Sequence, residues 1–273
     1  MKSKYTTIAV FLVTAGLSGA VTIVGSTDFE NLTAGDTALN GQSSGAPFAG
    51  AWAGNGNTVV TADPYNAANT VVATTGGSQM VGTFDAATQA VLNASSEVWF
   101  SMDMGTNHNS GTNRFGLMTD NGALMDSTFT IGQRLGGLQT RIGPWNGNAP
   151  DLTGGGAVDG ACEVITTNGW TANTAYTLVG RITVDRTLGG TESLEFWQVA
   201  AGTFDYNNPG SAYITMTGID LIEPTTQITG FVIDGNQGGN AYDNLTVLVP
   251  EPSSALLLGL GALGFALRRR RNG

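Results

Sequence analysis

Short segments in which apolar and polar side chains alternate recur along most of this chain. In one of them Leu178, Ile182 and Val184 fall on one side, whereas Thr183 and Asp185 fall on the other. Alternate residues of a β-strand point to opposite faces of a sheet. A strand with one apolar and one polar face is typical of antiparallel sheets that pack on a shared core. The pattern therefore predicts an all-β fold.

Turn-forming residues separate these segments. The chain has 273 residues and 40 glycines, about twice the usual glycine share of ~7%. Clusters of Gly, Asn and Asp favour the turns between short strands, and no amphipathic helix is visible. We predict a two-sheet antiparallel jelly-roll sandwich. Its clearest strands are Thr58–Thr61, Thr70–Thr74, Glu97–Met104, Arg114–Met118, Thr128–Gly132, Glu163–Thr166, Tyr176–Asp185, Ser193–Val199, Ala212–Met216, Ile228–Asp234 and Tyr242–Val249.

The first 20 residues have the three parts of a secretory signal peptide. Lys2 and Lys4 form the positive start, an apolar stretch follows over Ile8–Leu17, and small residues fill Ser18–Ala20. This order predicts an N-terminal signal helix that signal peptidase removes after Ala20. The chain is therefore expected to be exported.

The far end combines an apolar run with a cluster of positive charge. Thirteen residues without a polar side chain, Ala255–Leu267, would span about 20 Å as a helix, which is short of the ~30 Å hydrocarbon core of a bilayer. The basic residues after it would stay in the cytoplasm and leave the domain outside. The run is preceded by Pro250, Glu251 and Pro252, and it is followed by Arg268, Arg269, Arg270 and Arg271.

This tail resembles the PEP-CTERM sorting tail of Gram-negative, biofilm-forming bacteria over residues 250–273. The resemblance implies processing by an exosortase, a transient stage in the inner membrane, and a final place at the cell surface or in the extracellular matrix. Proteins with this tail are commonly associated with extracellular polysaccharide. An ordinary transmembrane anchor is the weaker alternative, because the apolar run is short. The expected organisation is a signal peptide at 1–20, a β-sandwich domain at 21–249 and the sorting tail at 250–273.

The net charge of the segment between the two ends argues against nucleic acid as a partner. Residues 21–250 hold five basic and 20 acidic residues, a net charge of −15. A surface of this sign repels nucleic acid and anionic lipid. Cys162 is the single cysteine, so no intrachain disulfide can stabilise the fold.

Three short stretches resemble the concanavalin A-like (laminin-G-like) sandwiches that often precede such tails. They are Asp28–Gly35, Val98–Ser101 and Tyr242–Val247, and their order spans nearly the whole domain. The resemblance implies the jelly-roll fold, and only loosely a role connected with carbohydrate.

A structural calcium ion is the first site hypothesis. Asp243 has the parity of Leu245 and Val247, so a regular strand would tilt it toward the core. A buried carboxylate needs a partner or a metal. In the jelly rolls that this chain resembles, an acid of the closing strand and one of the opening segment bind Ca²⁺, which implies Asp243 with Asp28 or Glu30. In the alternative, Asp243 only bonds backbone N–H groups of a turn.

Trp99 and Trp145 are the glycan-binding candidates. Trp99 shares the polar face of its strand, and Trp145 lies in a loop rich in Gly and Asn. An indole can stack on a sugar ring, although Trp more often covers the edge of a core.

Catalysis finds little support in the sequence. Glu97 and Asp103 share a face but lie about 20 Å apart along a strand, too far for the paired acids of a glycosidase. His108 is the single histidine. The sequence thus predicts a non-catalytic, exported structural or glycan-associating protein, with a polysaccharide-active hydrolase or lyase on the same fold as the alternative.

Overall fold

The structure is a computed structural model of the chain, and it describes residues 21–33, 35, 37–54, 57–63, 70–74, 78–106, 112–119, 128–134, 137–142, 162–219, 222, 224–235 and 240–251. The predicted signal helix, Pro252, the apolar run 255–267 and the cluster Arg268–Arg271 lie outside these residues. So do Trp145 and His108.

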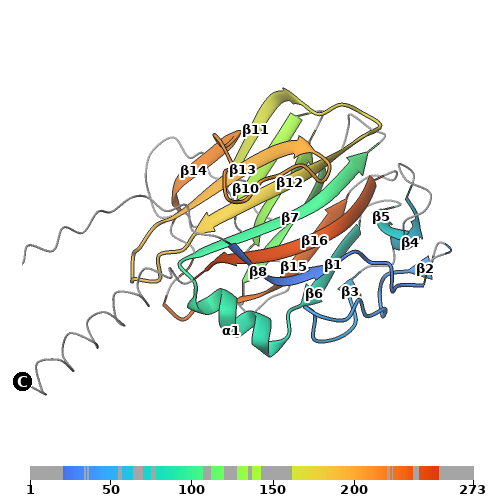
Figure 1. The fold of residues 1–273 in the computed structure, drawn as a ribbon, viewed down its shortest axis with the longest axis horizontal. Helices are drawn as coiled ribbons and strands as arrows, with labels where there is room; N and C mark the ends of the chain where they lie inside the picture. The colour runs from blue at the N-terminus through green and yellow to red at the C-terminus, as the bar shows by residue number, and fades with distance from the viewer. Residues whose placement is uncertain are drawn as a thin grey trace, which may run out of the picture.

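Two antiparallel sheets form a sandwich, as the alternation predicts (Figure 1). The nine-stranded sheet has the order β14-β13-β12-β7-β16-β5-β4-β2, with β1 also paired to β16. Its strands are β1 Val21–Thr27, β2 Thr37–Ala38, β4 Thr58–Ala62, β5 Thr70–Thr74, β7 Glu97–Thr106, β12 Thr174–Thr183, β13 Glu192–Ala200, β14 Ile214–Ile219 and β16 Asn240–Pro250.

The seven-stranded sheet has the order β11-β10-β9-β8-β15-β6-β3. Figure 1 shows it behind the larger sheet, with the helix α1 at one edge of the sandwich. The elements are β3 Ala53–Gly54, β6 Ser78–Thr83, α1 Ala86–Ala94, β8 Thr112–Thr119, β9 Thr128–Arg134, β10 Gly137–Ile142, β11 Cys162–Gly169 and β15 Ile228–Gly235.

The core between the sheets is built from the apolar faces of the alternating strands. Met102 and Met104 of β7, with Leu178 and Ile182 of β12, have no exposed surface. Phe100 contacts the rings of Phe115 and Phe231 across the sandwich, with 6.3 Å between ring centroids in each pair. All of these belong to one continuous apolar cluster, so the two sheets stabilise each other mainly by burying apolar surface.

The outer faces carry smaller buried groups. On the nine-stranded sheet Trp99, Val179, Trp197 and Leu248 form a second apolar cluster. On the seven-stranded sheet the Arg114 guanidinium lies 3.3 Å from the Asp234 carboxylate, and both side chains are almost fully buried. Neither outer face is therefore the uniformly solvated surface that simple alternation predicts.

Candidate functional site

The strand that leads into the tail, β16, stays paired with β1 up to its last residue. Pro250 is its last residue and pairs with Val21 of β1, and Val249 pairs with Thr22. The hydroxyl of Thr22 donates to the Glu251 carboxylate at 3.3 Å. Because proline has no backbone N–H, it suits the end of a strand. Two of the three predicted sorting residues thus lie beside Val21, the first residue expected after signal peptidase.

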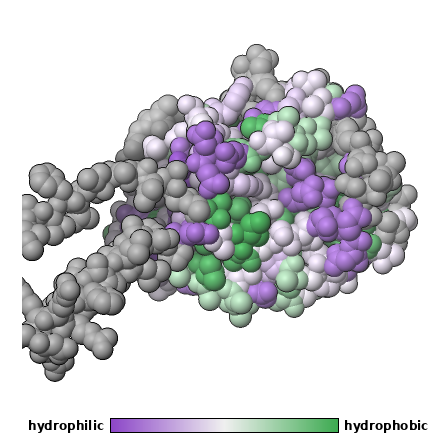
Figure 2. All heavy atoms as spheres, in the orientation of Figure 1, coloured by the Kyte–Doolittle hydropathy of each residue, from purple (hydrophilic) through white to green (hydrophobic). Residues whose placement is uncertain are grey.

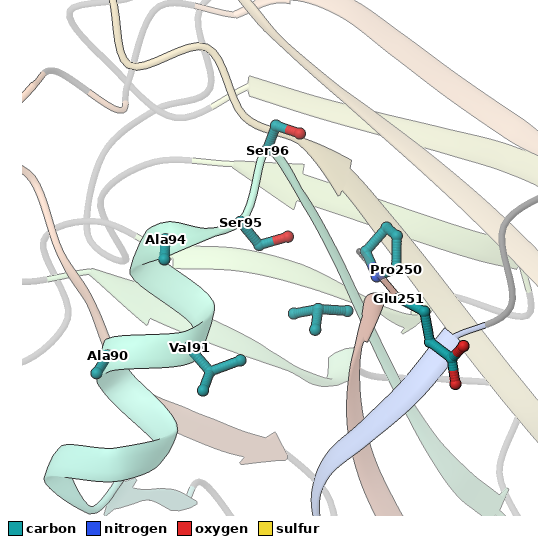
Figure 3. A pocket seen from close by; sticks show the side chains of 8 residues that line it. Ala90, Val91, Ala94, Ser95, Ser96, Pro250 and Glu251 are labelled. Carbon is teal, nitrogen blue, oxygen red and sulfur yellow. The ribbon is translucent and has the colours of Figure 1, made fainter. Parts of the chain in front are cut away.

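A groove opens next to these residues, between α1 and the end of β16 (Figure 3). It has a volume of about 550 Å³. In Figure 3 Val91 of α1 lies across the groove from Pro250 and Glu251. Among the described residues that line it, Glu251 alone is charged. The lining consists of Ala90, Val91, Ala94, Ser95, Ser96, Val249, Pro250 and Glu251.

Local chemistry fixes α1 in this place. Asp85 is the N-cap, and its carboxylate accepts the backbone N–H of Thr88 at 2.7 Å, a bond that lowers the pKa of Asp85. At the other end Asn93 joins β15: its Nδ2 donates to the Ile228 carbonyl at 3.0 Å, and its Oδ1 accepts the Ile228 N–H at 2.7 Å. With Leu92 fully buried, the helix presents its other face to the groove.

The aspartate of the calcium hypothesis lies on the other side of its sheet from the one that parity predicts. Tyr242 is in the core, and so is Leu245. The register of β16 against β7 shifts between Asp243 and Thr246, and Asn244 has a φ of 52°. This bulge reverses the alternation. The prediction that Asp243 tilts toward the core is therefore wrong: Asp243 pairs with Asp103 on the outer face of the nine-stranded sheet.

Asp243 is buried there all the same, with 7% of its surface exposed. Burial is the main cause that raises its pKa to about 6, and the charges of Asp103, Asp63 and Glu30 add to the rise. The backbone N–H of Asn244 donates to its Oδ1 at 2.7 Å and counteracts part of it. Asp243 is thus the most buried member of a group of carboxylates, and it resists ionisation.

Of the predicted calcium ligands, the structure brings Glu30 near enough to Asp243 to affect its pKa. Asp28 is exposed, and its Oδ1 accepts the N–H of Glu30 at 3.2 Å, as in an Asx turn. Within the ranges that the structure describes, no three Asp, Glu, His or Cys side chains form a group that could hold a metal ion. Asp243 and Glu30 would therefore need backbone carbonyl oxygens to complete a calcium shell.

The two carboxylates that do converge, Asp103 and Asp243, are held by neighbouring donors. The hydroxyl of Thr177 donates to Oδ1 of Asp103, and Nδ2 of Asn244 donates to its Oδ2 at 2.9 Å. Nδ2 of Asn244 also lies 3.3 Å from Oδ2 of Asp243. These bonds give the pair the character of a structural polar cluster.

Trp99 lies under other side chains, with 2% of its surface exposed. Its ring stacks on Trp197 with 5.3 Å between centroids, and Phe204 and Tyr206 contact it from the segment after β13. The guanidinium of Arg181 lies 5.0 Å from its ring centroid. This position fits the alternative in which Trp99 covers the sheet. Sequence reasoning missed Tyr213, which is 52% exposed and is the one exposed aromatic side chain among the described residues.

A family model of the PEP-CTERM protein-sorting motif matches residues 248–271. This motif indicates a protein that is exported and sorted to the cell surface by exosortase-type machinery. The match begins on β16 and includes all three predicted sorting residues and the four arginines. Among the described residues no helix is long and apolar enough to cross a membrane.

The chain is similar to several solved structures at low sequence identity. A PL-14 alginate lyase from Aplysia kurodai superposes with a TM-score of 0.56 at 9% identity, covering 84% of this chain and 100% of its own. An endo-β-1,4-glucuronan lyase from the fungus Trichoderma reesei gives 0.44 at 9%, covering 83% and 95%. The globular domain of T. cruzi calreticulin gives 0.46 at 12%, covering 90% and 95%. No curated protein matches the chain. The first of these likenesses supports the jelly-roll sandwich, and it supports the fold alone.

Proposed function

We propose that this chain is a surface or extracellular-matrix protein that an exosortase-type enzyme processes, and that its sandwich is a non-catalytic structural or glycan-associating module. The observation that carries the proposal is the sorting motif, which continues directly from the last strand of the folded domain. In this proposal signal peptidase removes residues 1–20, residues 21–249 form the exported domain, and residues 250–273 are the sorting tail, with a short membrane helix at 255–267.

The geometry of the ends supports this order of events. Val21 and Pro250 are cross-strand partners, so the two segments that flank the exported domain leave it at the same end of the paired strands β1 and β16. A domain with this arrangement can fold outside the membrane while the tail still holds it, because neither end has to pass around the sandwich.

Replacing Pro250, Glu251 and Pro252 together by alanine is expected to abolish tail removal in a host that carries the processing enzyme. The replacement leaves the apolar run and the arginines in place, so insertion in the membrane should persist. Mass spectrometry of the C-terminus measures the result: the wild type should lose Arg268–Arg271, and the variant should keep them. Ser253→Ala with Ser254→Ala, two changes in the same tail, is the matched control and should be processed normally. A wild-type surface form that retains all four arginines would reject the proposal.

Among the described residues, Tyr213 is the side chain best placed to contact a glycan. An exposed aromatic ring is the side chain that stacks on a sugar, and Tyr213 is held in place by its backbone N–H, which donates to the Phe196 carbonyl at 2.7 Å. On an array of bacterial polysaccharides, Tyr213→Ala is expected to weaken binding of the surface form about fivefold, the equivalent of roughly 1 kcal/mol. Leu188→Ala, at an 85% exposed residue, should leave binding unchanged. Equal binding by Tyr213→Ala and the wild type would remove Tyr213 from the role.

The calcium hypothesis remains a proposal for the carboxylates around Asp243. Oxygen ligands suit Ca²⁺, and a cation would offset both the burial and the neighbouring carboxylate charges that raise the pKa of Asp243. The stability of the wild type and of Asp243→Asn, each measured with and without calcium, tests this proposal.

A further inference from the structure

We propose that the groove between α1 and the end of β16 is a docking surface for the membrane-embedded processing enzyme, which fills it with apolar side chains while it holds the sorting motif. This inference rests on the proposed function and names the partner surface that the motif alone does not provide. Val91 is the residue on which it chiefly depends.

Only a short length of chain separates the groove from the expected membrane segment. Glu251 lines the groove, and only residues 252–254 separate it from the apolar run that starts at Ala255. Four Cα–Cα steps lead from Glu251 to Ala255, and together they span at most about 14 Å. Until the tail is removed, the Glu251 wall of the groove is therefore held within about 14 Å of the start of the apolar run.

The groove is continuous with the sorting motif itself. Pro250 and Glu251 belong both to the motif and to the wall of the groove. An enzyme that binds these residues comes into contact with the groove. The opposite wall of the groove consists of Ala90, Val91 and Ala94 of α1. Binding of the enzyme to the motif would therefore also bury the groove.

The surface around the groove exposes apolar side chains. Val91 is 44% exposed, and Ile23 of the neighbouring β1 is 60% exposed. Figure 2 shows hydrophobic surface gathered over α1 and β1, beside hydrophilic groups. Apolar side chains kept in contact with water next to a binding motif are typical of a protein interaction site.

Lipid is a poorer occupant of this groove. A surface that binds bilayers combines apolar residues with Lys and Arg, which meet anionic headgroups. The charged residue among the described residues of the groove is Glu251, and residues 21–250 carry a net charge of −15. The electrostatics favour an apolar protein surface over the headgroup layer.

Val91→Glu in the full chain tests the proposal in a host that carries the enzyme. Pulse labelling, followed by the mass of the C-terminus, gives the rate at which precursor becomes processed protein. We expect the rate to fall about tenfold, the effect of losing one apolar anchor residue of an interface. Leu188→Glu makes the same kind of change at an exposed leucine in the loop between β12 and β13, and it should be processed like the wild type.

Two further variants separate loss of docking from loss of folding. Val91→Ala removes apolar surface without adding charge and should slow processing about threefold, in keeping with the smaller area it deletes. Val91→Ile keeps the apolar contact and should be processed at the wild-type rate. Because Val91 is partly exposed, the melting temperature of each variant should stay close to that of the wild type.

The outcomes distinguish this inference from the proposed function. Wild-type processing together with normal processing of Val91→Glu and Val91→Ala would overturn the docking surface and leave the sorting function standing. No processing of the wild type would overturn both. In a host without the enzyme, a smaller membrane-bound fraction for Val91→Glu than for the wild type would identify lipid as the occupant and would also overturn the inference.

Discussion

Asp243→Asn is expected to raise the free energy of unfolding at pH 7, in chelated solution, by about 3 kcal/mol. The folded protein raises the pKa of this carboxyl from 3.8 to about 6, and two pKa units correspond to about 3 kcal/mol. Asparagine removes the buried charge but keeps an oxygen that can accept the Asn244 N–H, now 2.7 Å from the aspartate. Asn244 keeps its bond to Asp103.

The pH dependence gives this prediction its sign. Because the folded pKa lies above the unfolded one, the folded state holds a proton between about pH 4 and pH 6 that the unfolded chain has released. The wild type should therefore lose stability as the pH rises through this range, and Asp243→Asn should not. The two proteins should be equally stable near pH 3.5. Urea unfolding at pH 3.5, 5 and 7 measures the difference.

Asp185→Asn is the matched control, because its carboxyl is perturbed in the opposite direction. The hydroxyl and backbone N–H of Thr187 bond to Asp185 and lower its pKa. The stability that this group contributes is present above its unfolded pKa and lost as the pH falls through the folded one. Asp185→Asn should therefore be slightly less stable than the wild type at pH 7. A loss of stability at pH 7 for Asp243→Asn as well would contradict the assignment of a raised pKa.

Added calcium extends the same experiment to the metal hypothesis. A cation that binds the folded protein at Asp243 raises its stability by mass action. The wild type should then gain stability at pH 7 in millimolar calcium, and Asp243→Asn should gain none. A wild type whose unfolding midpoint is the same in calcium and in chelator would remove calcium from this site and leave the structural polar cluster of Asp103, Asp243 and Asn244.

The fold could be predicted because each long strand carries its own alternation. All eleven strands expected from the sequence overlap strands of the structure, from β4 to β16, although β12 ends two residues earlier and β14 begins two residues later than expected. The short strands β2 and β3 have two residues each, which is too few for any period. Among the described strands β1 pairs only with β16, and its exposed Ile23 breaks the expected pattern.

The helix α1 was missed for a different reason. Its apolar residues are mostly alanine, so the buried face depends on Leu92 and Thr88 and the amphipathic period is weak. The signal that could have found it is the N-cap: Asp85 stands three residues before Thr88 at the head of an alanine-rich run. Without α1 the groove beside the sorting motif could not be foreseen.

The bulge at Asp243 shows where reasoning from parity fails. One residue with a positive φ, Asn244, moves Asp243 from the core side to the outer side of the sheet. Asn tolerates this conformation better than most residues, but a single Asn in a strand is not enough to predict a bulge. The acidic partners Asp103 and Asp63 come from distant strands and loops, and only the register brings them to Asp243.

Gly180→Ala is expected to destabilise the sandwich by about 3 kcal/mol, the upper range for one extra methyl in a packed core. Gly180 of β12 pairs with Phe100 of β7. A Cβ at this position would lie 2.3 Å from Cζ of Phe100 and 2.6 Å from its Cε1. The ring cannot move away easily, because it is fully buried against Phe115 and Phe231. Gly50→Ala, at an ordinary φ with nothing within 4 Å of the new Cβ, is the control and should change stability little.

A double-mutant cycle shows whether the clash with Phe100 is the cause. Phe100→Leu alone should cost about 2 kcal/mol through the cavity it leaves. In the presence of leucine the alanine methyl has room, so the double variant should be more stable than the sum of the two single losses by about 1–2 kcal/mol. Strictly additive losses would mean that Gly180 is required for its backbone and not for the ring above it.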